Sequence, residues 1–108
     1  MNFTHSIAYF LGGALMANAI PHWVSGLMGR PFQSPFAKPP GKGLSSSLVN
    51  VLWAAFNLLL AWLLVLRVGT FDLRDGSDAA ALGLGALLAS VGLARNFGKL
   101  HGGNNPQL

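Results

Sequence analysis

Cysteine is absent from this sequence and charge is scarce, with seven Lys and Arg against three Asp and Glu. Without cysteine, the chain has no disulfide, no thiolate metal ligand and no cysteine nucleophile. Charged residues make up 9% of the 108 residues and hydrophobic residues 52%, whereas a soluble domain is about 25% charged. A small soluble domain must cover a large surface with polar groups. The composition therefore predicts an integral membrane protein whose apolar surface faces lipid.

Three apolar runs predict an all-α fold, a bundle of three transmembrane helices in a single membrane domain over residues 1–108. The strongest run predicts a helix at about 47–67, close to the ~20 residues that cross a ~30 Å hydrocarbon core. A first helix is expected at about 3–29 with a kink at Pro21, since membrane helices tolerate proline. The third, at about 78–97, is rich in glycine and alanine and is the shortest apolar run.

The segments between these helices are expected to be loops at 30–46 and 68–77, followed by a tail at 98–108. Prolines restrict the backbone of loop 30–46, so this Pro/Gly/Phe-rich loop should be structured, with Phe32 and Phe36 at the membrane interface or under the bundle. Serines at its end and aspartates in the second loop supply N-caps for the helices that follow.

Basic residues predict the orientation of the helices, because cytoplasmic loops retain Lys and Arg. Five of the seven lie in the first loop or after the third apolar run, which ends at Ala94: Arg30, Lys38, Lys42, Arg95 and Lys99. This distribution places the N-terminus outside and the C-terminus in the cytoplasm of a multi-pass cell-membrane protein. The three cations of the first loop are also candidates to contact anionic lipid head groups, at ~1 kcal/mol each near such a surface, although basic residues that only set topology give the same pattern.

A cleaved signal peptide is an alternative interpretation of the first apolar run. Ala17-Asn18-Ala19 resembles a small-x-small cleavage motif, but the preceding residues contain no Lys or Arg, whereas signal peptides begin with a positively charged segment. We therefore expect this segment to remain as a membrane helix.

Polar side chains recur along one face of each of the first two helices. They are Asn18, His22 and Ser25 in the first helix, and Asn50, Trp53 and Asn57 in the second. Both sets follow the 3.6-residue repeat, and at 1.5 Å per residue they lie at matching depths in antiparallel helices. We predict that His22 faces Asn50 or Trp53 and that Asn18 faces Asn57.

Two interpretations of these polar faces remain open, and they are compatible. The side chains can join the helices, since interhelical hydrogen bonds contribute ~0.6 kcal/mol on average and up to ~1.7. They can also line a polar site for a small ligand, an ion or a lipid head group, because polar groups clustered within a membrane indicate a functional site.

Small residues at helical spacing predict close helix packing. They are Gly13 and Ala17 in the first helix, and Ala81, Gly85, Ala89 and Gly92 in the third. A second line of small residues on the third helix suggests contact with a neighbouring subunit. We therefore expect a homo-oligomer or a larger membrane complex, although glycine and alanine are also common in membrane helices generally.

Several chemistries are not supported by the sequence. The three histidines fall in different regions and no carboxylate lies inside an apolar run, so we expect no metal site and no cofactor. His22 has no acidic partner to orient it as a general base. The stretch PPGKGLSSS lacks the spacing of a phosphate-binding loop, so no nucleotide is expected, and the basic residues are too few for a nucleic acid.

These observations predict a protein that is not an enzyme, a small oligomeric or accessory subunit of a membrane protein complex embedded in the lipid bilayer. The alternative is a small homo-oligomeric channel or transporter whose route is lined by the Asn and His side chains. A third hypothesis is a membrane subunit that binds haem or a pigment.

Overall fold

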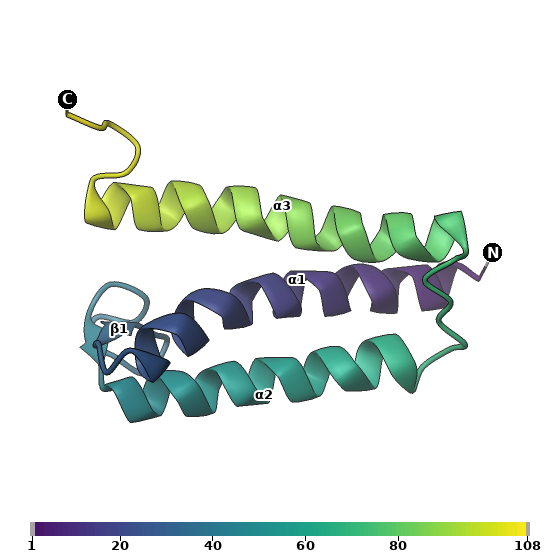
Figure 1. Cartoon of the computed structure of the whole chain (residues 1–108), viewed down its shortest axis with the longest axis horizontal. Coiled ribbons are helices and arrows are strands. Elements are labelled where there is room, and N and C mark those ends of the chain that lie inside the picture. The colour runs from purple at the N-terminus through teal and green to yellow at the C-terminus, as the bar shows by residue number, and fades with distance from the viewer. Residues whose placement is uncertain (1, 108) are drawn as a thin grey trace.

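The computed structural model describes residues 2–107 and is predominantly helical (Figure 1). Its elements are α1 (Phe3–Leu27), β1 (Phe32–Gln33), β2 (Leu44–Ser45), α2 (Ser47–Leu66) and α3 (Gly76–His101). The two short strands pair antiparallel within the loop between α1 and α2, so the predicted structured loop is a small hairpin. We call the end of the molecule that carries this hairpin the hairpin end; the α2–α3 loop and the N-terminus lie at the opposite end.

The helices form an open layer with α1 in the middle, flanked by α2 and α3 (Figure 1). Its dimensions are 43 × 32 × 22 Å. Adjacent glycines allow α1 to approach both neighbours: a Cβ atom at Gly12 would overlap Val65 of α2, and one at Gly13 would overlap the backbone of α3. The three helices therefore form a layer, because α2 and α3 pack on α1 rather than on each other.

Helix bounds agree with the sequence for α1 and α2 but not for α3, which was expected to be the shortest and has 26 residues. Charged residues ended the apolar run used to predict it, but a charged residue does not end a helix. The helix begins after the Asp75 cap, whose carboxylate accepts hydrogen bonds from the backbone N–H groups of Ser77 and Asp78. It ends at Gly102, which has the positive φ of 85° that glycine adopts easily.

Within residues 2–107, two helices, α2 and α3, are long and apolar enough to cross a membrane. Both are largely exposed in the single chain, and the one buried residue of α3 is Gly85. Helix α1, which continues through Pro21 as far as Leu27, does not reach the same hydropathy. Its polar residues, including Asn18 and His22, lower its mean hydropathy.

Candidate functional site

The midpoints of α1 and α2 are joined by a pair of asparagines. The Asn18 amide nitrogen donates to Asn57 Oδ1 over 3.0 Å. Asn57 is 1% exposed, and its own amide nitrogen donates to the Trp53 carbonyl oxygen at 2.8 Å. The predicted pairing of Asn18 with Asn57 is confirmed, and both ends of the Asn57 amide are occupied by protein partners.

Nearer the hairpin end, His22 and Asn50 form the second predicted pair, which is also confirmed. His22 is 3% exposed and its Nδ1 lies 2.7 Å from Asn50 Oδ1. The Asn50 amide nitrogen faces three carbonyl oxygens, those of Phe32, Ser45 and Ser46, at 3.0–3.2 Å. These acceptors fix the orientation of the amide, so its oxygen accepts the hydrogen bond and His22 Nδ1 carries the proton.

Asn50 thus joins α1 and α2 to the hairpin, which the spacing along α2 did not reveal. The side chain is fully buried. Its partners Phe32 and Ser45 belong to the two strands, and a hydroxyl hydrogen bond between Ser34 and Ser45 also links the two sides of the hairpin. One buried amide therefore fixes both helix register and loop position.

Aromatic rings surround the imidazole of His22. Phe32, Phe97 and Trp53 lie with ring centroids 5.5, 6.4 and 6.5 Å away, each nearly perpendicular to it. Edge-to-face contact is a favourable geometry for such rings. Residues from all three helices and the hairpin meet here, so the tertiary fold forms this enclosure.

His101 also belongs to this cluster, although the sequence placed it in a separate tail. It is the last residue of α3, and its Nε2 lies 2.9 Å from Gln33 Oε1 of β1. Its ring stacks on Phe97 with centroids 6.0 Å apart and meets Phe32 at 5.5 Å. No local pattern links His101 to Gln33, because the contact depends on the extension of α3 beyond its apolar run.

A partly open cavity of about 180 Å³ lies at this end of the molecule. Its polar lining comes from Asn18, His22, Gln33, Ser34, Trp53 and Asn96. Among the described residues, the buried indole N–H of Trp53 has no hydrogen-bond acceptor, and His22 Nε2 has no partner. Both residues line the cavity, and each carries one hydrogen-bonding group that the described part of the chain leaves unused.

Other predicted site residues lie elsewhere. Ser25 is half-buried, does not line the cavity, and has no side-chain hydrogen bond to any residue between 2 and 107, so the polar face of α1 ends at His22. Arg30, Lys38 and Lys42 are exposed in the segment at the hairpin end. They lie outside the cavity and can reach surrounding solvent or lipid.

Close packing at small residues is present between α1 and α3, at Gly13 and Gly85. A Cβ atom at Gly85 would overlap the carbonyl group of Phe10. Ala17 is buried, and Ala81 and Ala89 are half-buried. Gly92 does not pack: it is exposed, with open space where a Cβ atom would lie. Figure 1 shows the reason, because α1 and α3 diverge toward the hairpin end.

Metal ligands do not gather around the polar cavity: nowhere in residues 2–107 do three His, Cys, Asp or Glu side chains approach one another closely enough to hold an ion.

No family of known proteins, no curated protein and no solved structure matches the chain. The chemistry that the site offers is therefore inferred from its own groups, which are suited to hydrogen bonding in an apolar enclosure.

Proposed function

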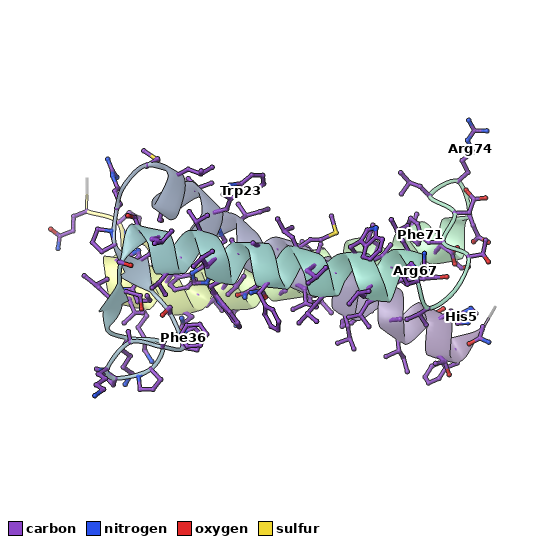
Figure 2. All side chains as sticks on the ribbon, turned by 90° about the horizontal axis from the view of Figure 1, so that it is seen from below. His5, Trp23, Phe36, Arg67, Phe71 and Arg74 are labelled. Carbon is purple, nitrogen blue, oxygen red and sulfur yellow. The ribbon has the colours of Figure 1, made fainter. Side chains whose placement is uncertain are left out.

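We propose that all three helices cross the bilayer, with the N-terminus outside and the hairpin end at the cytoplasmic face. At 1.5 Å per residue, even α2, with 20 residues, covers the ~30 Å hydrocarbon core. Trp23 and Trp62 each lie four residues before a helix end, at opposite ends of the molecule, where interfacial aromatics are enriched. Figure 2 shows Trp23 and Phe36 toward one end and Arg67, Phe71 and Arg74 at the other.

Helix α1 is less apolar than its neighbours, and the layer explains how it can still cross. Asn18 and His22 direct their polar atoms at α2 rather than at lipid. Its lipid-accessible positions include Ile7, Leu11 and Ile20, which are exposed and apolar. A polar group that is hydrogen-bonded to a neighbouring helix avoids the cost of an unpaired group in hydrocarbon.

Within that membrane, the chain acts as a small, non-catalytic subunit that associates with further membrane helices. The observation that carries this function is the open layer. Because α2 and α3 pack on α1 rather than on each other, an apolar groove of about 330 Å³ remains, lined by residues of all three helices and of the loop before α3. Its walls include Met16 of α1, Leu58 of α2 and Leu82 of α3. A helix from another subunit, or from a second copy, would complete the bundle there.

The alternatives have less support. A channel lined by the asparagine faces needs those amides on a shared axis, whereas Asn18 and Asn57 are bonded to each other inside one chain. Haem ligation by two histidines needs a second imidazole facing His22, whereas His101 directs its Nε2 at Gln33.

Site-specific photo-crosslinking tests the accessory function. A photoreactive amino acid at Met16, inside the groove, should give a discrete protein adduct in native membranes. The matched control is Leu87, which is exposed on α3 and does not line the groove; a crosslinker there should react mainly with lipid. Purification in mild detergent should recover the same adduct partner. A chain that elutes alone as a monomer, with only lipid adducts at Met16, would contradict the proposal.

A further inference from the structure

The polar cavity at the hairpin end contains two groups whose hydrogen bonding is incomplete. His22 Nδ1 donates to Asn50, so the Nε2 of a neutral imidazole is an acceptor with its lone pair free. The Trp53 indole can only donate, and its N–H is buried without an acceptor among the described residues. A buried donor left unmade costs about 1–3 kcal/mol, so a bound group that accepts from Trp53 would be favoured.

A single hydroxyl group satisfies both requirements, because it donates one hydrogen bond and accepts others. The rings of His22 and Trp53 have centroids 6.5 Å apart, and both line the same cavity. A hydroxyl between them can donate to His22 Nε2 and accept from the Trp53 N–H. A carbonyl or ether oxygen could use the Trp53 donor but would leave His22 Nε2 unused.

Charge in the lining argues for a neutral head group. The polar wall consists of amide, hydroxyl, indole and imidazole groups, with no Lys, Arg, Asp or Glu among the residues that form it. Burying an unpaired phosphate or ammonium in such a place is costly. The volume of about 180 Å³ corresponds to roughly six water molecules at ~30 Å³ each, enough for a glycerol-sized head.

An apolar groove adjoins the cavity and shares Trp53 and Pro35 with it. This groove of about 730 Å³ is open, and besides these two residues it is lined by Phe36, Val49, Leu52 and Phe56. The residues that α2 contributes to this groove recur at helical spacing from the first turn of the helix to its middle. The groove therefore extends away from the hairpin end. The polar cavity thus lies near a helix end and the apolar track extends toward the middle, which is the arrangement of an amphiphile in one leaflet.

We propose that the cavity binds the head of an uncharged lipid alcohol, whose hydroxyl bridges His22 Nε2 and the Trp53 N–H while a hydrocarbon chain lies in the adjoining groove. The occupant comes from the membrane itself, since the groove opens along the surface of α2. This inference depends on the proposed membrane placement, but not on the association with further helices.

The test uses the full chain in phosphatidylcholine nanodiscs, with dioleoylglycerol as the probe. Indole N–H resonances report each tryptophan separately, and Trp23 and Trp62 serve as internal controls because they do not line the cavity. The expected result is a saturable shift of the Trp53 signal alone. The methyl ether of the same lipid lacks the hydroxyl proton, so it should bind about tenfold more weakly, as expected for one lost hydrogen bond in a buried site.

A protein variant gives an independent test that does not depend on the choice of lipid analogue. Trp53→Phe keeps an aromatic ring but removes the donor, and should also bind about tenfold more weakly, measured through the His22 ring nitrogens. Trp62→Phe is the matched control and should bind normally. The proposal is overturned if the Trp53 signal does not move, if alcohol and ether bind equally, or if dioleoyl phosphatidic acid binds more tightly than the alcohol. Loss of the crosslinked partner at Met16 would leave this result unchanged.

Discussion

Replacing Asn50 with leucine should destabilise this protein more than the same change at Asn57. Both amides are fully buried on the same face of α2, so the two substitutions are matched in chemistry and burial. Asn50 accepts from His22 and donates toward three carbonyls, whereas Asn57 bonds Asn18 and the carbonyl of its own preceding turn.

The magnitudes follow from these partners. Asn50 has two amide protons, so it makes about three full hydrogen bonds, which at ~0.6 kcal/mol each within a membrane sum to about 2 kcal/mol. Removing it also leaves the His22 Nδ1–H buried without an acceptor, which costs about 1–3 kcal/mol. The free energy of unfolding should therefore fall by about 3–5 kcal/mol.

The loss at Asn57 should be smaller, about 1 kcal/mol, because Asn18 is only partly buried. Reversible unfolding in mixed micelles of mild detergent and dodecyl sulfate, followed by circular dichroism, measures both variants. The difference between them, about 2–4 kcal/mol, corresponds to a change of roughly thirtyfold or more in the unfolding equilibrium. If Asn50→Leu is no more destabilising than Asn57→Leu, the assignment of Asn50 as the residue that joins two helices and the hairpin is wrong.

Three further predictions concern helix packing, capping and topology. Gly85→Ala should destabilise the chain by about 1–3 kcal/mol in the same unfolding assay, because a methyl group would overlap the Phe10 backbone. The control is Gly83→Ala, which lies in open space on the same helix and should be neutral or stabilising by up to ~1 kcal/mol. Hydrogen bonds from the Ser77 side chain and backbone hold the pKa of the Asp75 carboxyl below its ordinary value. The stability that the Asp75 carboxylate contributes is therefore present above about pH 4 and is lost as the pH falls further. The thermal unfolding of Asp75→Asn should lack this acid-dependent component, and equal acid profiles for the two proteins would show that the cap does not titrate. Since the chain has no cysteine, Lys42→Cys and Arg74→Cys can be labelled with an impermeant maleimide, and labelling from the same side of sealed vesicles would disprove the proposed crossing.

Much of the local structure could be predicted from the sequence. The pairings of Asn18 with Asn57 and of His22 with Asn50 follow from helical periodicity. The bounds of α1 and α2 follow from the apolar runs, and the caps at Ser46 and Asp75 from the polar residues that precede the helices. The pairings were predictable because antiparallel helices joined by a loop place equal distances from that loop side by side, and because an amide or imidazole in an apolar segment needs a partner.

The candidate site was predictable only in part. The two helical faces that contribute His22 and Trp53 were identified, but the hairpin and α3 complete the cavity through Gln33, Ser34 and Asn96. Hydropathy underestimated the length of α3, because it measures whether a segment is apolar rather than whether it is helical. The prediction that Gly92 packs against another helix was wrong, because α1 and α3 diverge and leave open space beside it.

The sequence alone thus determined that the chain is helical, where α1 and α2 begin and end, and which polar residues share a face, because each depends on neighbours within a few turns. Only the tertiary structure decided that α1 lies between α2 and α3, that His101 contacts Gln33, and that the Trp53 N–H, near His22, finds no acceptor within residues 2–107. These outcomes depend on contacts between residues far apart in the chain. Apolar helices of similar composition can pack in several arrangements, and close contact at a few glycines, together with one buried amide, selects among them.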